Sequence, residues 1–306
     1  MNRSLGHLAM LALRDLRVRA YPLAPGFRQD GQGPYPLDLR SVSRSFRLGA
    51  DGVVAVAGPD GRPYRNPVSA GLYALALHTE TSGQPGQPGA AVAGFLAQAS
   101  YLRDSQDANG GWRYPVPVTR YRVAPGWYSA MAQGLAISVL LRAYDATSHT
   151  SYLDAAGAAA TLMLKPLGAG GCADYDETGR PFLEECPSDP PCRILNGAVF
   201  AVIGLCEHEA RTGGHGHSAA AGLRLAAELG RYDLGYWSRY DQRFAAPASL
   251  AYHCLHISLL EVAAWLLADD AFSRAADVWR SYLRHRGNRL RAAVNKARFV
   301  LGDSRG

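Results

Sequence analysis

Residues 106–112 read Gln-Asp-Ala-Asn-Gly-Gly-Trp, at the end of a segment in which apolar residues recur at three- and four-residue spacing. That spacing is typical of a helix with one buried face. Glycine readily takes the left-handed backbone that ends many helices, and Trp112 can then pack back over the helix end. The stretch therefore predicts a helix that stops at this turn.

The same apolar spacing recurs along most of the chain after Pro67. Gly, Pro or polar breaks separate the predicted helices, which cover residues 68–83, 89–106, 128–147, 151–164, 194–211, 216–230, 252–268 and 271–299. The last segment is too long for one helix, and we expect a break near Gly287. Two long interruptions, residues 110–127 and 165–193, are expected to be irregular, and such segments often carry function.

Serial helix pairs indicate either a bundle or an α/α toroid, and the turn at 106–112 resembles turns of terpenoid cyclases and related α/α barrels. The first 66 residues are rich in Gly, Pro and Arg, with one predicted β-hairpin over residues 52–64. The predicted fold is therefore mainly α. We expect an incomplete (α/α) toroid of antiparallel helix pairs as the catalytic domain over residues 67–306, after an irregular N-terminal segment with a short β-hairpin over residues 1–66.

The composition is that of an ordinary globular protein. The chain has 306 residues, of which 48% are hydrophobic and 19% charged, which excludes wholesale disorder and collagen-like repetition. The longest apolar run, residues 198–206, is about half of the ~18 to 20 residues that a membrane span needs. The apolar stretch His7–Leu13 is followed at once by charged residues and predicts an amphipathic helix rather than a signal peptide. We therefore expect a cytoplasmic protein without a membrane span.

The five cysteines have no metal-type spacing, so a chain with reduced thiols and no bound metal is the simplest interpretation. The formal charge is +6, and all basic residues except Lys165 and Lys296 are arginines. This bias fits a GC-rich genome, or a surface that binds carboxylates through guanidinium groups. Basic residues interleaved with aromatic ones in a block are missing, so no nucleic-acid partner is expected.

The commonest catalytic motifs are also missing from the sequence. There is no phosphate-binding Gly-x-x-x-x-Gly-Lys loop, no glycine fingerprint after a strand and no Gly-x-Ser-x-Gly elbow. No cofactor is therefore expected. Four strings that are rich in aromatic, acidic and basic residues remain: residues 125–134, residues 182–187 with 195–197, residues 238–243, and residues 252–256.

Each string has a structural interpretation beside the functional one. Trp127 and Tyr128 suit a hydrophobic cap at a helix N-terminus, and Glu185 suits a solvated loop carboxylate. Residues 240–243 suit a surface hydrogen-bond cluster. Of the histidines at 253 and 256, the first is best interpreted as a core residue.

In their order and amino-acid sequence, these strings resemble the C-terminal catalytic domain of the D-glucuronyl C-5 epimerases, in a short, bacterial-type form. The resemblance covers about residues 50–290. It includes Gly-Gly-Trp at 110–112, the string 125–134, Glu-Glu at 184–185 with Leu-Asn-Gly at 195–197, Tyr-Asp at 240–241 and Tyr-His at 252–253. It implies C-5 epimerisation of D-glucuronic acid to L-iduronic acid in a heparosan-like glycan, by removal and return of a proton.

The resemblance also implies which residues line the catalytic cleft. The implied catalytic residues are Glu185, Tyr240, Arg243 and Tyr252. Proton transfer at a carbon alpha to a carboxylate needs acid and base groups on opposite faces of the sugar, for which we assign Glu185 and Tyr252. A cation must hold the enolate-like intermediate, for which Arg243 is suited. The implied substrate-binding residues are Tyr64, Trp127, Tyr128, Gln133, Asn196, His256 and Cys186.

Two departures from the family pattern bear on the substrate. Cys186 stands where the animal enzymes carry a tyrosine, and a thiol there is shorter, although it titrates at lower pH. The large β-rich region of the animal enzymes, which helps to build their cleft and dimer, is reduced here to the hairpin near 52–64. An oligosaccharide, a lipid-linked unit or another carboxylated metabolite is therefore an alternative substrate, and a homodimer is a further expectation.

Two other functions fit the same residues. A uronate polysaccharide lyase begins with the same proton abstraction and then expels the group at C-4. A catalytically idle carbohydrate-binding homologue would explain Cys186, although the intact Glu185, Tyr240, Arg243 and Tyr252 favour an enzyme.

Overall fold

The structure is a computed structural model that describes residues 21–81, 89–214, 216–244 and 246–303. It is mainly helical, as predicted. The helices are α2 (Arg40–Ser43), α3 (Pro67–Thr81), α4 (Ala90–Asp104), α5 (Ala130–Thr147), α6 (Ser151–Leu164), α7 (Leu195–Thr212), α8 (His217–Glu228), α9 (Leu250–Leu267), α10 (Asp270–Arg284) and α11 (Arg286–Asp303). Short 3-10 turns cover Thr119–Tyr121, Leu167–Ala169 and Leu229–Tyr232. The N-terminal helix expected near residues 7–13 lies outside the described residues.

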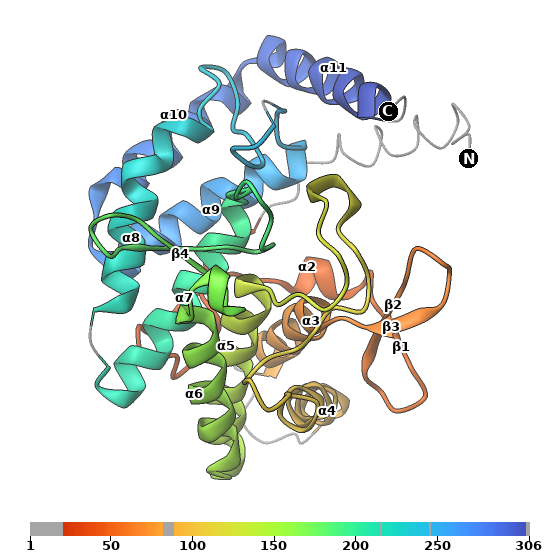
Figure 1. Ribbon diagram of the computed structural model, residues 1–306. Coiled ribbons are helices and arrows are strands. Elements are labelled where there is room, and N and C mark those ends of the chain that lie inside the picture. The colour runs from red at the N-terminus through yellow and green to blue at the C-terminus, as the bar shows by residue number, and fades with distance from the viewer. Residues whose placement is uncertain (1–20, 82–88, 215, 245, 304–306) are drawn as a thin grey trace.

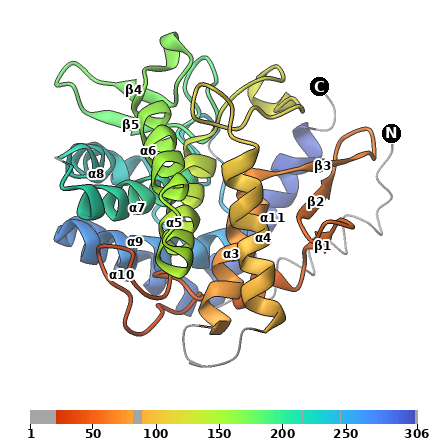
Figure 2. The ribbon, with the colours of Figure 1, turned by 90° about the horizontal axis from the view of Figure 1, so that it is seen from below.

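The helices pack in two rows (Figures 1 and 2). In one row, α3 contacts α5, α5 contacts α7, and α7 contacts α9. Each of these helices also contacts the helix that follows it along the chain, so that α4, α6, α8 and α10 form the second row. Successive helices from α3 to α10 therefore alternate between the two rows, as expected for serial antiparallel pairs.

The helix boundaries agree with the sequence predictions to within about two residues at most ends. Helix α9 begins two residues earlier than predicted, because the Ser249 hydroxyl accepts a hydrogen bond from the backbone N–H of Tyr252 and caps the helix. The long C-terminal segment breaks at His285, close to the expected position near Gly287.

Both β-elements are small antiparallel arrangements. The predicted hairpin is confirmed as β2 (Val54–Ala57) with β3 (Pro63–Arg65), and β1 (Arg47–Leu48) adds a third strand. The prediction that residues 165–193 are irregular is wrong in part. They contain a second hairpin of β4 (Ala173–Tyr175) and β5 (Pro181–Leu183), and β5 is buried and leads directly into Glu184.

The turn at 106–112 behaves as predicted and connects three helices. Gly110 has a φ of +90°, and an added Cβ would lie 2.4 Å from the carbonyl oxygen of Ala158 on α6, so only glycine fits. Trp112 packs back over the end of α4, where its indole N–H donates to the Leu102 carbonyl over 3.1 Å. The Gln106 amide reaches the Ala155 carbonyl on α6.

A buried ion pair fastens the N-terminal segment to the helices. Arg142 on α5 and Glu207 on α7 are about 1% and 0% exposed, and their closest contact is 2.8 Å. The Arg142 guanidinium also donates to the carbonyl oxygens of Gly33 and Pro34. Tyr35 and the leucines that follow it are consequently buried in the same hydrophobic core as α3, α5 and α7.

Helix α9 is apolar on nearly every side. Its 18 residues have a mean hydropathy of 1.5, which satisfies the length and composition of a membrane span, and half of the helix is buried inside the protein. In the described part of the chain it is the single helix with this property. A core helix between packed neighbours has the same composition, and α9 lies between α7 and α10.

Helices α5 and α7 approach closely at a pair of glycines. An added Cβ at Gly204 would lie 2.2 Å from the carbonyl oxygen of Gly134, and one at Gly134 would lie 2.5 Å from that of Phe200. These atoms belong to helix backbones, which cannot yield without moving a helix.

We therefore expect Gly204→Ala to lower the free energy of unfolding by roughly 2–3 kcal/mol, as overpacking does. Gly157→Ala on α6 is the control, because the nearest atom to an added Cβ is 3.8 Å away. That variant should be neutral or stabilised by up to about 1 kcal/mol through helix propensity. Urea denaturation measures both, and equal effects of the two substitutions would contradict the interpretation.

Candidate active site

Four segments bring polar residues together on one side of the molecule: the connection from β5 to α7, the loop 110–127, the loop 233–249 and the first turn of α9. Their contacts centre on Glu185, which is the second residue after the buried strand β5. Residues that are adjacent in an extended chain point to opposite sides. Glu184 accordingly faces an arginine in the interior, whereas Glu185 faces the aromatic residues of the other segments.

The Glu185 carboxyl lies against the start of α7. The Asn196 side-chain amide approaches Glu185 Oε2 at 3.4 Å, and a Cβ on Gly197 would lie 2.3 Å from the same oxygen, so that glycine makes room for the carboxyl. Asn196 itself is 2% exposed. Its Oδ1 has no hydrogen-bond partner among the described residues. Burial, and next the charge of Glu184, raise the pKa of Glu185 to about 7.

Tyr240 lies near this carboxyl, and Tyr252 lies against Tyr240. The rings of Tyr240 and Tyr252 meet edge to face with their centroids 4.8 Å apart. Burial raises the pKa of Tyr240 well above its usual range, and the charge of Glu185 adds to the shift. Tyr252 is 39% exposed, so this end of the cluster is open to solvent. The structure therefore brings together three of the four predicted catalytic residues: Glu185, Tyr240 and Tyr252.

Two histidines support the first turns of α9. His253 stacks on Trp237 at 3.7 Å, accepts from the Ser238 backbone N–H and contacts the Trp279 carbonyl, which confirms the interpretation as a core residue. His256 lies 6.4 Å from the ring of Tyr252, and its Nδ1 meets the Ser238 hydroxyl at 3.0 Å. Burial lowers the pKa of His256 to about 3, so the imidazole is neutral. Its Nε2 has no hydrogen-bond partner in the part of the chain that is described.

Tyr114 is a site residue that the sequence analysis missed. It is 5% exposed, and its pKa is raised well above the usual value by burial and next by the charge of Glu185. Its hydroxyl donates to Asn66 Oδ1 over 3.3 Å, and the Asn66 amide in turn donates to the Tyr64 hydroxyl. Trp127 stacks on the Tyr114 ring at 4.1 Å. Two predicted substrate-binding residues, Tyr64 and Trp127, therefore contact the site through Tyr114.

The side chains of Tyr128 and Gln133 contact the turn 106–112. The Tyr128 hydroxyl donates to Asp107 and accepts from the Asn109 amide. The Gln133 amide is buried and donates to the Gly110 carbonyl over 2.9 Å. These contacts give both side chains a supporting role, and their predicted contact with substrate stays a prediction.

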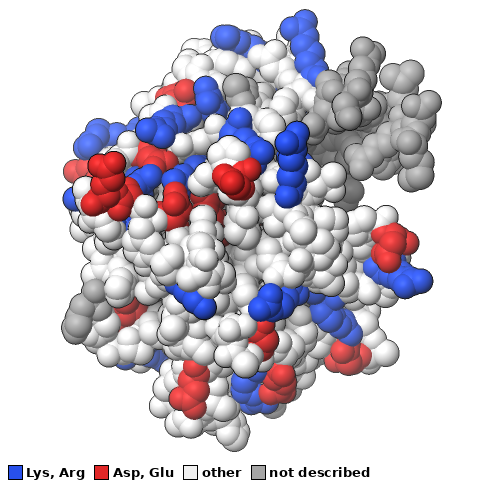
Figure 3. Space-filling view, viewed as in Figure 1, with Lys and Arg blue, Asp and Glu red and all other residues white. Residues whose placement is uncertain are grey.

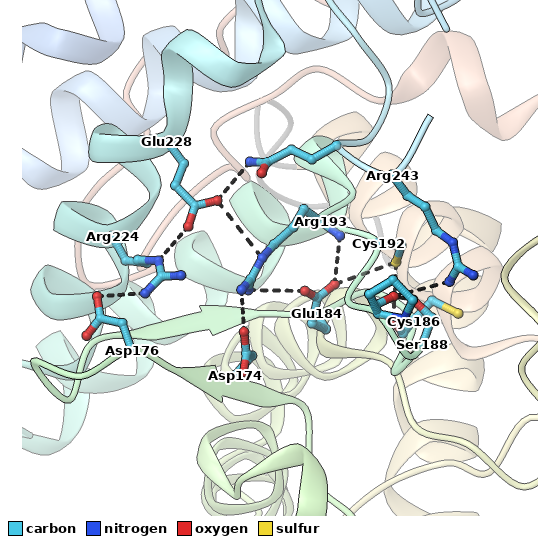
Figure 4. Close-up of polar contacts among 12 residues, drawn as sticks. Asp174, Asp176, Glu184, Cys186, Ser188, Cys192, Arg193, Arg224, Glu228 and Arg243 are labelled. Atoms are coloured by element: carbon cyan, nitrogen blue, oxygen red, sulfur yellow. Dashed lines mark hydrogen bonds and ion pairs between the residues drawn. The ribbon is translucent and has the colours of Figure 1, made fainter. Parts of the chain in front are cut away.

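Arg243 and Cys186 lie at the loop that follows Glu185 (Figure 4). The Arg243 guanidinium donates to the Pro190 carbonyl over 3.1 Å and is partly exposed. Cys186 is 2% exposed in a small apolar cluster with Tyr121 and Cys192, against which Tyr240 packs. The Cys186 thiol is thus placed beside Tyr240, away from open solvent.

Arg193 is the second residue that the sequence analysis missed, and it organises the charged network of Figure 4. Its guanidinium pairs with Asp174 on β4, with Glu184 at 3.2 Å and with Glu228 on α8 at 4.0 Å. Its backbone N–H also donates to Glu184 Oε2. Glu184 is fully buried, and burial raises its pKa to about 7 although Arg193 acts in the opposite direction.

The network extends to the loop that carries Tyr240. The Gln242 side-chain amide donates to Glu228 Oε2 over 2.8 Å, and the Gln242 backbone N–H donates to the Cys192 carbonyl. The backbone N–H of Leu195 donates to the Tyr240 carbonyl. Backbone contacts of Cys192 and Leu195, which lie before and after Arg193 in the sequence, therefore fix the loop of Tyr240 relative to the segment that carries Glu185.

Metal chemistry has no clustered ligands to use in the described residues, where no group of three or more His, Cys, Asp or Glu side chains converges. All five cysteines carry free, buried thiols. The groups that the structure gathers at the site include the Glu185 carboxyl, the phenols of Tyr114, Tyr240 and Tyr252 and the neutral imidazole of His256.

A family model described as "D-glucuronyl C5-epimerase C-terminus" matches residues 106–281, which include Glu185, Tyr240, Arg243 and Tyr252. The chain belongs to this family. It is 33% identical over 213 residues to the D-glucuronyl C5-epimerase of Caenorhabditis elegans, covering 61% of this chain and 34% of the worm protein. It is 28% identical over 178 residues to an uncharacterised protein of Methanocaldococcus jannaschii, covering 55% and 56% of the two chains. The chain thus spans about a third to just over half of the length of these relatives.

The network around Arg193 yields a stability test. Arg193→Met removes the cation from the buried Glu184, and removing one partner of a buried pair costs about 3–5 kcal/mol. We expect a loss of about 3 kcal/mol in the free energy of unfolding at pH 8. The loss should shrink toward pH 5, where Glu184 is protonated.

The double variant Arg193→Met/Glu184→Gln should recover at least half of that loss, because the fully buried carboxylate that lost its cation is then replaced by a neutral amide. Arg180→Met, at an exposed position after the β4–β5 turn, is the matched control and should change stability by less than about 0.5 kcal/mol. Equal losses in the single and double variants, measured by urea denaturation, would show that the charge of Glu184 is not what Arg193 compensates.

Proposed function

We propose that this protein epimerises D-glucuronic acid to L-iduronic acid at C-5 within an anionic, heparosan-like glycan. The observation that carries the proposal is the part-buried Glu185 carboxyl, whose pKa is raised to about 7, with Tyr240 near it and Tyr252 against Tyr240. Family membership supports an epimerase, and the identity to the worm enzyme supports a glucuronyl substrate. The alternation of the helices between two rows supports an incomplete α/α toroid as the scaffold.

In the proposed reaction, Glu185 takes the proton from C-5, and the electron pair of the broken C–H bond moves into the carboxylate to form an enolate. Tyr252 then donates its phenolic proton to C-5 from the opposite face, which inverts the carbon. Glu185 has gained a proton and Tyr252 has lost one. We assign the return of the proton between them to Tyr240, because its ring contacts that of Tyr252 and its pKa is raised by the charge of Glu185 after burial.

The substrate carboxylate needs a cation while the enolate exists, and we assign this role to Arg243. Among the described residues, its guanidinium donates to the Pro190 carbonyl, a weaker partner than a carboxylate, and lies 5.9 Å from the centre of the Phe244 ring. Asn196 Oδ1 and His256 Nε2, which have no hydrogen-bond partner within the described ranges, are the proposed contacts for sugar hydroxyls. Cys186 would tune the position of Tyr240. The cytoplasmic location and a homodimer are expectations that accompany this proposal.

The decisive experiment is incubation with unsulfated heparosan in deuterium oxide, followed by proton NMR. We expect loss of the glucuronate H-5 signal and new iduronate signals. Glu185→Gln and Tyr252→Phe should each slow the exchange at least about 100-fold, because each removes a proton-transfer group. Glu177→Gln and Tyr175→Phe, at exposed positions of the β4–β5 hairpin, are the matched controls.

Each other outcome has a definite meaning. A product with a C-4/C-5 double bond, seen by its ultraviolet absorbance, would replace epimerisation by β-elimination. Absence of any exchange by the unaltered protein on heparosan and on its oligosaccharides would refute the proposal for glucuronate glycans.

The pKa of Glu185 predicts the pH dependence of the exchange. Glu185 must be deprotonated to act as a base, and burial keeps it protonated below about pH 7. We therefore expect kcat/KM to rise about tenfold per pH unit up to pH 7 and to level off above it. A rise that is complete by pH 5 would show that Glu185 is not the group that must lose its proton.

A further inference from the structure

Three segments of the chain concentrate its positive charge. Residues 110–127, 234–244 and 286–299, here called the basic rim, contain ten of the 32 Lys and Arg residues and one of the 26 Asp and Glu residues. That single acid, Asp241, is 1% exposed and accepts a hydrogen bond from the Tyr121 hydroxyl. The rest of the chain holds more acidic than basic residues, so the positive net charge of the protein comes from the rim.

The three segments meet in space. The Arg120 guanidinium lies over the rings of Phe244 and Phe299, at 4.9 and 4.3 Å, and these two rings are 5.8 Å apart. Arg120, Phe244 and Phe299 come from the first, second and third segment respectively. Nε and Nη2 of Arg120 are buried without a hydrogen-bond partner among the described residues.

Helix α11 is held firmly in the rim. The Asn295 amide donates to the Tyr236 hydroxyl over 2.9 Å, and the Arg291 guanidinium stacks on the Tyr236 ring at 3.8 Å. Ala292 is 4% exposed in a small core with Tyr236 and Trp237. These contacts fix a helix with five basic residues in its first 14 positions, over a length of about 20 Å.

The rim borders the candidate active site. Its first segment carries Tyr114 and its second carries Tyr240 and Arg243. Phe244, which contacts α11, packs with Tyr240 against the apolar cluster that contains Cys186. Leu250, two residues before Tyr252, packs on the small core of Tyr236 and Trp237 that also holds Ala292. Helix α11 therefore lies beside the end of the site that opens to solvent at Tyr252.

The arginines of α11 are available to a ligand. Arg286, Arg289, Arg291 and Arg298 are exposed. No ion pair joins any of these four to an acidic side chain within the described ranges, whereas about half of the other described arginines have one. In Figure 3, Lys and Arg side chains predominate in the upper part of the view, where α10 and α11 lie in Figure 1.

We propose that the basic rim binds the length of anionic glycan that flanks the reacting uronate, and that α11 is a binding element added beyond the family domain. The inference rests on the proposed function, because it takes a uronic-acid polymer as the ligand. The matched family region ends at residue 281, before α11 begins. Guanidinium groups bind carboxylates through paired hydrogen bonds, and a regular polymer offers one carboxylate in each disaccharide to a row of arginines.

The test is direct binding, which does not require turnover. The affinity of the full chain for heparosan polymer and for a heparosan tetrasaccharide is measured by calorimetry at low and at physiological salt. We expect the protein to bind the polymer more tightly than the tetrasaccharide. The affinity for the polymer should fall as the salt concentration rises, because salt screens exposed charges.

Arg286→Gln/Arg298→Gln should weaken polymer binding about five-fold at low salt, as expected for two exposed ionic contacts. The same change should be at most two-fold for the tetrasaccharide. Arg180→Gln/Arg274→Gln is the matched control, since it removes the same charge from exposed positions on the β4–β5 hairpin and α10. It should leave both affinities within two-fold.

The outcomes separate the two proposals. Equal weakening by both double variants, or none by either, would overturn the role of α11, whatever the exchange experiment shows. Polymer and tetrasaccharide binding with the same affinity would overturn it as well. H-5 exchange on the tetrasaccharide together with either result would leave the epimerase proposal intact, whereas absence of exchange with rim-dependent polymer binding would refute catalysis alone.

Discussion

The ion pair between Arg193 and the buried Glu184 is the constraint on which the site depends. Two glutamates follow β5, and the extended chain turns them in opposite directions. Glu184 enters the protein, where a lone carboxylate would be costly, and Arg193 compensates it through its side chain and its backbone N–H. With Glu184 fixed, Glu185 has little freedom to move away from the start of α7.

The same guanidinium gathers the segments that carry the other site residues. Asp174 connects it to the β4–β5 hairpin, and Glu228 connects it to α8 and through Gln242 to the loop of Tyr240. Buried networks of this kind give a site a definite geometry only when every charge has a partner. In this protein the Arg193 guanidinium pairs with three carboxylates, those of Asp174, Glu184 and Glu228. Glu228 has a second cationic partner in Arg224.

The sequence was sufficient for features with a local cause. The helices follow from apolar spacing, and the turn at 106–112 follows from Gly110 and Trp112, whose contacts are those expected. The β4–β5 hairpin was missed because its strands are three residues long and lie among glycines, prolines and charges, too short for alternation to show. Tyr114 was missed because its partner Glu185 is far away in the sequence. Arg193 was missed because the connection between it and Glu184 has no periodic pattern that would predict their contact. Motif resemblance found the catalytic candidates, and it also selected Tyr128 and Gln133, whose contacts support the turn.

The centre of the site and its surroundings differ in charge. Burial favours the neutral form of every group that titrates with a resolved direction near the centre: the Glu185 carboxyl, the Tyr114 and Tyr240 phenols and the His256 imidazole. A neutral interior does little to attract an anion from a distance. The cations lie around it, on Arg243 and the other basic residues of the rim. Under the proposed function, an anionic glycan is drawn to the rim first, and its uronate then meets groups that burial holds in their neutral forms.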